Sequence, residues 1–247
     1  MKCIILAAGY ATRLYPLTEN FPKPLLKVND KAIIDWLIDD IEISGRIDEY
    51  IIISNHKFIK YFEKWKKEKD IDTKITLIDD GTTSNENRKG AVMDISIAID
   101  TLNLNDDLLV VAGDNVFDFS LNRFIDYFEE KKTTCIMRYY EGNKEKIKKS
   151  ASVKIDVNDS VIEMVEKPLV ANSHWCCPPF YVYIKNDVPM VKKALESGCN
   201  PDAPGSFINW LYDKRNIHAM EMPGKRYDIG NLESYNQVNE IYKGIAN

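Results

Sequence analysis

The sequence predicts an α/β protein whose sheet contains parallel strands buried on both faces. Three continuous apolar runs indicate such strands, because a strand covered by helices on both sides is apolar along its whole length: residues 4–6, 50–53 and 108–111. Segments with apolar residues at helical spacing lie between them, at residues 31–45 and 57–69. This alternation of strands and helices is typical of the α/β class.

The remainder of the chain continues with strands and helices in mixed order. Further strands are expected at residues 74–78, 133–138 and 217–222, with an alternating hairpin at residues 151–157 and 161–165. Helices are expected at residues 91–100, 124–130, 187–196, 206–214 and 232–242. The charged stretch at residues 141–149 is expected to be an external loop.

Composition excludes several classes of function. The 247 residues are 45% hydrophobic and carry a net charge of −5, so neither nucleic acid nor a membrane is expected as a partner. No run of 18 apolar residues is present, and the N-terminus reads as a core strand rather than a signal peptide. The five cysteines are an odd number without a C-x-x-C pair. We therefore expect reduced thiols and a cytoplasmic location.

The first 28 residues carry the clearest chemistry. The first strand runs into the small residues Ala7-Ala8-Gly9, which let the backbone approach a ligand closely. A turn of exposed N–H groups cradles phosphate, and Arg13 and Lys23 add the positive charges that phosphates attract. The stretch therefore predicts a nucleoside triphosphate site.

Later in the chain a carboxylate follows a buried strand directly, at Gly113-Asp114-Asn115. In open α/β sheets ligands bind at the carboxyl ends of the strands, and carboxylates there suit hard cations. A plain turn aspartate is the alternative, since Gly-Asp-Asn also suits a turn.

These motifs resemble the sugar-1-phosphate nucleotidyltransferase family, in particular its glucose-1-phosphate thymidylyltransferase-like members of the GT-A type. The family pattern L-A-A-G-x-G-[ST]-R-L-x-P-L-T, then P-K-P-L, is similar to Leu6–Thr18 followed by Pro22–Leu25. Ala11 replaces the second glycine, and because alanine disfavours positive φ we expect a reshaped phosphate loop. The family elements E-K-P and D-x-G also occur, at Glu166-Lys167-Pro168 and Asp228-Ile229-Gly230.

The resemblance implies a doubly wound three-layer α/β sandwich with a mostly parallel mixed sheet and a small inserted acceptor-binding lobe. It implies one nucleotidyltransferase domain over residues 1–247. The nucleotide-binding half would span about residues 1–115, the acceptor-binding half about residues 116–235, and a C-terminal helix residues 232–242. A two-fold or tetrameric homo-oligomer is the family default.

The implied activity is magnesium-dependent nucleotidyl transfer from a nucleoside triphosphate to a sugar-1-phosphate, giving an NDP-sugar and pyrophosphate. The implied metal ligands are Asp114 and Asp228, for Mg²⁺. The implied catalytic residues are Arg13, Lys23, Asp114, Lys167 and Asp228. Nucleotide binding is assigned to Leu6, Ala7, Ala8, Gly9, Tyr10, Ala11, Thr12, Gly90 and Asn115. Acceptor binding is assigned to Glu166, Lys167, Trp175, Phe180 and Tyr181.

Two alternatives remain open from the sequence. Residues 174–183, HWCCPPFYVY, depart from the family, and aromatic walls can hold a quaternary ammonium group as well as a sugar. A cytidylyltransferase acting on phosphocholine or a phosphonate is therefore the first alternative, and a catalytically silent nucleotide-sugar-sensing subunit is the second. Base reading by residues 85–88 also stays open beside a plain solvent loop.

Overall fold

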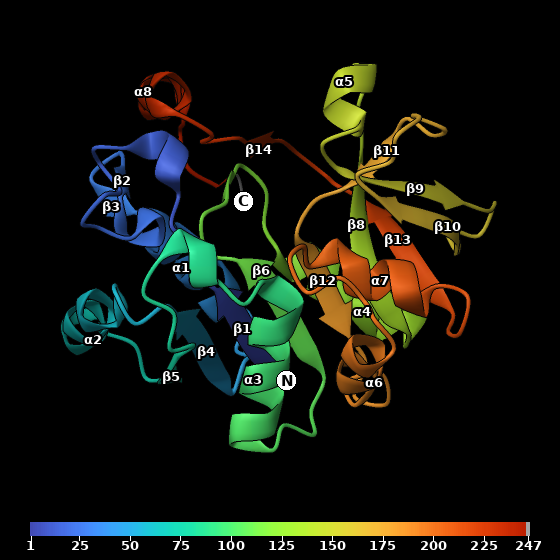
Figure 1. Ribbon diagram of the computed structural model, residues 1–247, viewed down its shortest axis with the longest axis horizontal. Coiled ribbons are helices and arrows are strands. Elements are labelled where there is room, and N and C mark those ends of the chain that lie inside the picture. The colour runs from blue at the N-terminus through green and yellow to red at the C-terminus, as the bar shows by residue number, and fades with distance from the viewer. Residues whose placement is uncertain (246–247) are drawn as a thin grey trace. The chain divides into compact units, whose positions relative to one another are not determined.

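The computed structural model describes residues 1–245, which form two compact units (Figure 1). Unit 1 comprises Met1–Arg88, Ala112–Arg123 and the segment from Pro223 onward, and unit 2 comprises Lys89–Val111 and Phe124–Met222. Each unit is assembled from segments that are distant in the sequence. The predicted division near residue 115, with one substrate assigned to each half, remains a prediction.

Unit 1 is built on three parallel strands in the order β1-β4-β5. These are β1 (Lys2–Leu6), β4 (Glu49–Ser54) and β5 (Lys74–Asp79). Every residue of β4 is buried, as expected for a strand covered on both faces. The helix α1 (Ile33–Glu42) lies in the connection from β1 to β4, and α2 (Ile59–Glu68) lies in the connection from β4 to β5.

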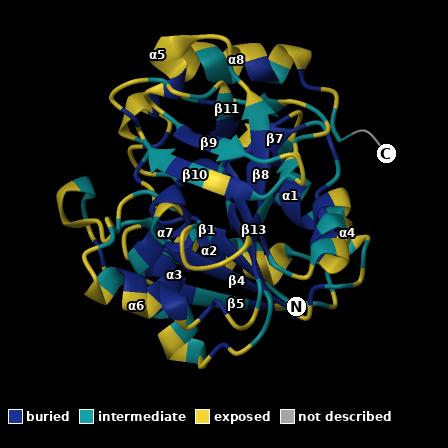
Figure 2. Ribbon diagram, turned by 90° about the vertical axis from the view of Figure 1, so that its right-hand side faces the viewer, coloured by how far each residue is buried: buried dark blue, intermediate teal, exposed yellow. Residues whose placement is uncertain are grey.

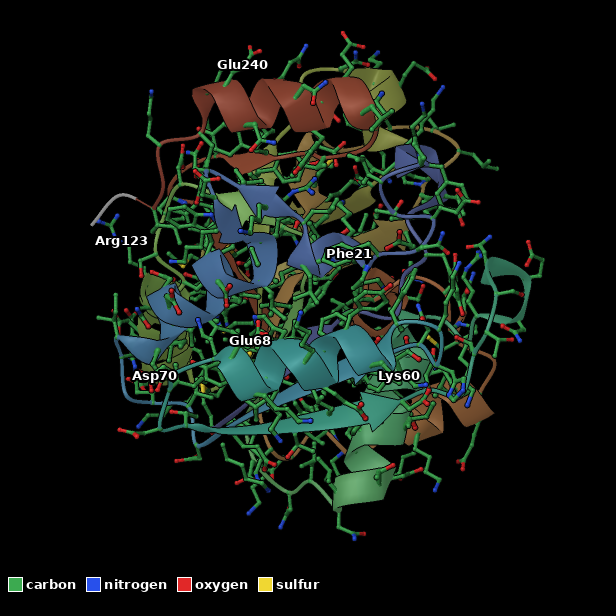
Figure 3. The ribbon with its side chains drawn as sticks, turned by 90° about the vertical axis from the view of Figure 1, so that its left-hand side faces the viewer. Phe21, Lys60, Glu68, Asp70, Arg123 and Glu240 are labelled. Atoms are coloured by element: carbon green, nitrogen blue, oxygen red, sulfur yellow. The ribbon has the colours of Figure 1, made fainter. Side chains whose placement is uncertain are left out.

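The helix α2 shows how the pattern of residues decides burial in unit 1. Phe62, on the inner face of the helix, is fully buried. Lys60 near the start of the helix and Glu68 at its end are exposed (Figure 3). The prediction of a helix within residues 57–69 is confirmed.

The short elements of unit 1 surround the loop after β1. They are η1 (Thr12–Leu14), η2 (Lys23–Leu25), β2 (Lys27–Val28), β3 (Lys31–Ala32), η3 (Asn85–Asn87), β7 (Val116–Phe117), β14 (Arg226–Tyr227) and α8 (Leu232–Ile241). The C-terminal α8 is exposed on its outer side (Figure 2). Its Val238 joins Leu14, Leu26 and Ile229 in one buried apolar cluster, so the C-terminal segment supports the loop after β1.

Unit 2 contains a mainly antiparallel sheet in the order β10-β9-β11-β8-β12-β6, with β13 parallel to β8. The strands are β6 (Leu108–Ala112, its last residue in unit 1), β8 (Thr134–Tyr140), β9 (Ala151–Ile155), β10 (Val161–Glu166), β11 (Trp175–Cys177), β12 (Phe180–Tyr183) and β13 (Ile217–Glu221). The helices are α3 (Ala91–Leu102), α4 (Asn122–Lys131, its first two residues in unit 1), α5 (Lys144–Ile147), α6 (Met190–Glu196) and α7 (Gly205–Leu211). Of these, α3 packs on α6, α6 on α7, and α7 on β10.

One expectation about secondary structure is wrong: the charged stretch at residues 141–149 contains the helix α5. The side chain of Asn143 accepts hydrogen bonds from the backbone N–H groups of Glu145 and Lys146, which are otherwise unpaired at a helix start. Ile147 is fully buried. One apolar anchor and one cap therefore suffice for a helical turn within a charged segment.

The α/β class predicted from the sequence is confirmed. All five cysteines are free, and Cys176 and Cys177 are buried, as expected for packing residues. Within residues 1–245, no helix combines the length and the apolar character needed to cross a membrane.

Candidate active site

A cavity of about 210 Å³ in unit 1, which we call the loop cavity, lies beside the segment that follows β1. It is lined by Leu6, Ala7, Gly9, Ala11, Arg13, Leu14, Lys23, Pro24, Asp114, Ile229 and Gly230. The structure thus brings together Arg13, Lys23 and Asp114, which were predicted as site residues from separate motifs. Ala8, Tyr10 and Thr12 belong to the same loop but do not line the cavity.

Hydrogen bonds from buried side chains hold the loop in place. The amide of Asn55 donates from Nδ2 to the carbonyl of Ala8 over 2.9 Å, and the Thr18 hydroxyl donates to the carbonyl of Ala11 over 2.8 Å. The Tyr10 hydroxyl lies 3.1 Å from Thr82 Oγ1. With three of its residues fixed in this way, the loop is preorganised for a ligand.

Ala11 adopts the left-handed conformation, with φ 47° and ψ 43°. This is a backbone region that glycine adopts readily, and the reshaping of the loop expected from Ala11 remains a prediction. For an alanine this conformation costs about 1 kcal/mol. The strain is tolerated because neighbouring residues of the loop are held by the bonds just described.

Lys23 and Asp114 form an ion pair in the loop cavity. Lys23 Nζ lies 2.8 Å from Asp114 Oδ2, and the side chains are 10% and 43% exposed. Partial burial alone would raise the pKa of the Asp114 carboxyl, but the charge and hydrogen bond of Lys23, aided by the charge of Arg226, lower this pKa below its ordinary value. Asp114 is therefore ionised at neutral pH.

Gly113 allows the turn that carries Asp114 to approach β1 closely. A Cβ added at Gly113 would lie 2.8 Å from Ile5 Cγ2, and the Gly113 N–H donates to the carbonyl of Leu6. A side chain at this position would push Asp114 away from the loop.

Asp228 borders the same cavity through the residues that follow it. A Cβ built at Gly230, a lining residue, would lie 3.4 Å from Asp228 Oδ2 and 3.8 Å from Arg13 Nη1. The Asp228 side chain is 76% exposed, and its Oδ1 lies 4.0 Å from Arg226 Nη1. The D-x-G motif therefore places a carboxylate and Arg13 at one edge of the loop cavity.

The donor set at this edge fits a hard divalent cation. Asp114 and Asp228 offer accessible carboxylate oxygens, the ligand type that Mg²⁺ prefers. Among residues 1–245, no group of three or more His, Cys, Asp or Glu side chains could form a metal cage. A cation here would therefore take only part of its coordination from the protein, as is usual for Mg²⁺ bound together with phosphates.

A second cavity, of about 630 Å³, lies in unit 2 at the end of the β9–β10 hairpin, and we call it the hairpin cavity. It is lined by Glu166, Lys167, Ser197, Gly198, Cys199, Asn200, Asp202, Ala203, Ser206, Asn209, Trp210, Tyr212, Asp213 and Lys214. Polar and charged side chains dominate this list. The E-K-P motif therefore contributes two residues to a wide, polar cavity.

Glu166 and Lys167 are positioned by unusual local geometry. Burial raises the pKa of the Glu166 carboxyl, and nearby Asp202 raises it further against the opposing charge of Lys167. A Cβ on Gly205 would overlap Glu166 Oε2, so this glycine makes room for the carboxylate. Lys167 has φ 48°, a strained backbone for a lysine that is more common at functional sites than elsewhere.

The aromatic residues predicted to bind the acceptor do not line the hairpin cavity. Phe180 and Tyr181 are 0% and 2% exposed in the interior of β12, so they serve the core. The Trp175 ring has the Arg138 guanidinium 5.0 Å from its centroid. The aromatic residues that do line the cavity are Trp210 and Tyr212, and the Trp210 ring centroid lies 4.4 Å from Lys214 Nζ.

Gly90 and Asn115 occupy structural positions. A side chain at Gly90 would overlap the backbone of Pro201, so this glycine lets α3 begin against the loop that ends in Asp202, within unit 2. Asn115 is buried and donates from Nδ2 to the carbonyl of Ala112 over 3.0 Å. Neither residue lines the loop cavity, and their assignment to the nucleotide remains a prediction.

Several polar groups of the loop at residues 85–88 form hydrogen bonds within the loop and with the two residues before it. Asn87 Oδ1 accepts from the backbone N–H groups of Thr83 and Ser84, and Arg88 Nη1 donates to the carbonyl of Asn85. These bonds account locally for the side-chain oxygen of Asn87 and for the backbone carbonyl of Asn85, and base reading by the loop remains a prediction.

Sequence reasoning missed several residues that shape the two cavities. Asn55 joins two segments, because its Oδ1 accepts from the Phe58 N–H and its Nδ2 donates to the carbonyl of Ala8. Arg226, which bonds to Asn115 Oδ1 over 3.3 Å, was not identified. Ser206 and Trp210 in the hairpin cavity were also missed. No contiguous motif marks these residues, because their roles depend on contacts between distant segments.

Comparison with known proteins agrees with this geometry. A family model described as "Nucleotidyl transferase" matches residues 2–244. The bifunctional protein GlmU of Methanocaldococcus jannaschii is 27% identical over 233 residues, which cover 93% of this chain and 51% of GlmU. A glucose-1-phosphate thymidylyltransferase of Mycolicibacterium smegmatis is 24% identical over 257 residues, covering 99% of this chain and 83% of the relative. The chain thus spans about half the length of the GlmU relatives it matches.

Solved structures show the same fold. A UDP-glucose pyrophosphorylase complexed with UDP-glucose superimposes with a TM-score of 0.80 at 20% identity, covering 98% of this chain and 97% of the other. The UDP-glucose pyrophosphorylase from Acinetobacter baumanii gives a TM-score of 0.78 at 17% identity, covering 98% and 92%. At these identities the likeness concerns the fold alone.

Proposed function

The chain belongs to the nucleotidyl transferase family, and on that premise we propose that it joins a nucleoside triphosphate to a sugar-1-phosphate, releasing pyrophosphate and forming an NDP-sugar. The observation that carries the proposal is the loop cavity itself. There Lys23 and Asp114 form an ion pair at 2.8 Å. In the adjoining loop, the carbonyls of two residues accept hydrogen bonds from the buried side chains of Thr18 and Asn55. The relatives named as thymidylyl- and adenylyltransferases support the reaction class.

The proposed reaction needs positioning and charge neutralisation more than acid–base chemistry. A phosphate oxygen of the acceptor attacks the α-phosphorus, and the bond from that phosphorus to the oxygen bridging to the β-phosphate breaks as pyrophosphate leaves. A phosphate monoester is already nucleophilic at neutral pH, so the barrier arises chiefly from bringing two anions together.

The loop cavity supplies the groups for the triphosphate. Backbone N–H groups of residues 8–12 would hold the phosphates, and Arg13 would bind the β- and γ-phosphates with its planar fork. Lys23 would neutralise charge near the α-phosphoryl group. Within residues 1–245, Arg13 forms no hydrogen bond or ion pair with another side chain and is exposed, so its guanidinium is available to a ligand.

Asp114 and Asp228 would hold Mg²⁺. Bound there, the ion would neutralise phosphate oxygens as charge develops on them. The lowered pKa of Asp114 supports this role, because only the ionised carboxylate is a good ligand.

The hairpin cavity suits a sugar phosphate better than a quaternary ammonium compound. Lys167 would hold the acceptor phosphate, and Glu166 with the surrounding polar groups would accept hydrogen bonds from sugar hydroxyls. An aromatic cage for choline would need several open aromatic faces, but Phe180 and Tyr181 are buried and Trp175 and Trp210 already contact cationic side chains. Among the residues that line the cavity this leaves Tyr212, and one ring does not form a cage. The acceptor-binding roles predicted for Phe180, Tyr181 and Trp175 therefore gain no support.

A pyrophosphate-release screen tests the proposal. Purified protein with Mg²⁺ is offered dTTP, UTP, CTP, GTP and ATP, each with glucose-1-phosphate, other sugar-1-phosphates, phosphocholine and aminoethylphosphonate. We expect one strong pair that contains a sugar-1-phosphate. Signal only with phosphocholine or the phosphonate would favour the alternative acceptor class, and silence across the grid from protein that binds a nucleotide would favour the sensing subunit.

Lys23→Ala assigns the activity to the loop cavity. Loss of the ammonium removes charge neutralisation and leaves Asp114 without its partner, so kcat/KM should fall by about 10²–10³-fold. Lys27→Ala is the matched control, because Lys27 is an exposed lysine on the neighbouring β2; it should keep wild-type activity. Full activity in Lys23→Ala, with thermal melting unchanged, would rule out the assigned role.

A cytoplasmic location and a homo-oligomeric state complete the proposal. The free cysteines support a reducing compartment. Size-exclusion chromatography with light scattering measures the oligomeric state directly.

A further inference from the structure

Arg226 connects the two segments that carry Asp114 and Asp228. Its Nη1 donates to Asn115 Oδ1 over 3.3 Å, directly after Asp114 in the chain, and lies 4.0 Å from Asp228 Oδ1. One guanidinium group therefore touches the neighbour of one carboxylate and approaches the other carboxylate itself.

The acceptor of this hydrogen bond is rigid. Asn115 is 4% exposed, and its Nδ2 donates to the carbonyl of Ala112 at the end of β6 over 3.0 Å. With both ends of its amide engaged, Asn115 cannot rotate without losing a bond. It therefore links the backbone at Ala112 to the side chain of Arg226 within unit 1.

The backbone of Arg226 is fixed as well. β14 pairs with β7 in antiparallel register, with Arg226 opposite Phe117 and Tyr227 opposite Val116. Asp118 fastens this ribbon, since its Oδ1 accepts from the Lys225 N–H over 2.7 Å and its Oδ2 accepts from the Tyr227 hydroxyl over 2.9 Å. The guanidinium group is therefore held from both ends.

We propose that Arg226 is a positioning residue that fixes the spacing of the Asp114 and Asp228 carboxylates and so sets the affinity for the divalent cation. The inference rests on the proposed function, in which these two residues bind the metal. Groups that orient metal ligands typically change metal affinity by about 10–100-fold when they are removed.

Charge and geometry make opposite predictions for this residue. A positive charge beside two carboxylates repels a divalent cation, so an Arg226 that acted only through its charge would weaken metal binding, and its removal would tighten binding. A positioning role requires a donor at the place of Arg226 Nη1, which contacts Asn115 and approaches Asp228, and the shorter, flexible lysine side chain does not hold its ammonium group there. Arg226→Lys and Arg226→Met together therefore separate the two effects.

The test is a titration of Mn²⁺, with free Mn²⁺ followed by electron paramagnetic resonance. Wild-type protein, Arg226→Lys, Arg226→Met and the control Lys225→Met are compared in the absence of substrates, with thermal melting recorded for each. Lys225→Met removes the same charge from the adjacent position, and among residues 1–245 the Lys225 ammonium group has no hydrogen-bond or ion-pair partner.

We expect both Arg226 variants to bind Mn²⁺ about tenfold or more weakly than wild type, with Lys225→Met unchanged and melting temperatures similar. Tighter binding in Arg226→Met with wild-type binding in Arg226→Lys would overturn the proposal in favour of a pure charge effect, and unchanged binding in both would also overturn it. If wild-type protein itself bound no Mn²⁺, the two-carboxylate site would fail together with this inference. The nucleotidyl-transfer screen is independent of that result.

Discussion

The loop cavity and the hairpin cavity differ in how their charged groups are treated. In the loop cavity Lys23 and Asp114 neutralise each other at 2.8 Å, and three buried or partly buried side chains fasten the adjoining backbone. In the hairpin cavity Glu166 is partly buried near a second carboxylate, and its pKa is raised rather than lowered. The loop cavity is small, and its Asp114 carboxylate is stabilised by an ion pair. The hairpin cavity is wide, and the charged form of its Glu166 carboxylate is destabilised by burial and by Asp202.

This difference corresponds to the two substrates that we propose. A triphosphate presents the same charges whatever its base, so a fixed loop with paired charges can serve it. An acceptor is defined by its hydroxyl groups, and a carboxylate that lacks a good partner in the protein gains one when such a hydroxyl binds. The cost of burying Glu166 would thus be recovered only in the complex, which favours discrimination between acceptors.

Lys167→Met tests the comparison with the largest expected effect. Lys167 lines the hairpin cavity and not the loop cavity, so its loss should raise KM for the sugar-1-phosphate by about 10–100-fold, the range for a charge-assisted hydrogen bond. KM for the nucleotide should remain within about threefold. Initial-rate kinetics with each substrate varied in turn measure both values.

Two further variants guard this interpretation. Lys185→Met removes an exposed lysine elsewhere in unit 2 and should leave both KM values unchanged. Lys167→Gly removes the ammonium group and also relieves the strain of φ 48°, so it should lose acceptor affinity without losing stability. An equal rise in both KM values for Lys167→Met would mean that the two cavities do not divide the substrates.

Glu166→Gln tests whether the ionised Glu166 carboxylate lowers the free energy of unfolding of the substrate-free protein. Because its folded-state pKa is raised, the folded protein binds this proton more tightly than the unfolded chain does. The associated stability is fully present below the ordinary glutamate pKa and is lost as the pH rises through the raised value. At pH 7 the neutral variant should therefore be more stable than wild type, by on the order of 1 kcal/mol.

Urea unfolding of wild type and Glu166→Gln at several pH values measures this difference. The gap between the two proteins should close as the pH falls below the ordinary glutamate pKa, while KM for the acceptor is higher in the variant at neutral pH. A variant less stable than wild type at every pH would show that Glu166 already has a favourable partner, and the contrast between the cavities would be lost.

The sequence predicted the loop cavity better than the hairpin cavity for a physical reason. Arg13, Lys23 and Asp114 each lie in a short motif whose residues act together, so local reading sufficed. Asn55 and Arg226 act through contacts with distant segments, and no local pattern marks them. These contacts exist only once the chain has folded.

In the aromatic segment of unit 2, the sequence-based assignment to the acceptor gains no support from the structure. Phe180 and Tyr181 were assigned to the acceptor, yet they belong to a continuous apolar run that forms β12 and is buried along its length. The rule that identified the strands of unit 1 as doubly covered applies equally here. Composition suggested a binding wall, whereas the position of the residues within a buried strand determined their role in the core.

Ala11→Gly has the smallest expected effect, and it tests whether Ala11 is strained and kept in its left-handed conformation by the hydrogen bonds of the neighbouring loop residues. Alanine at φ 47° is strained, and glycine would remove that strain while adding flexibility to the unfolded chain. We expect a net gain of about 0.5–1 kcal/mol in the free energy of unfolding, with activity within about threefold of wild type. Ala8→Gly is the matched control in the same loop, because Ala8 does not have positive φ and its replacement should destabilise the protein. Urea denaturation of the two variants should thus give shifts of opposite sign, and a loss of stability in both would show that the left-handed turn at Ala11 is not strained.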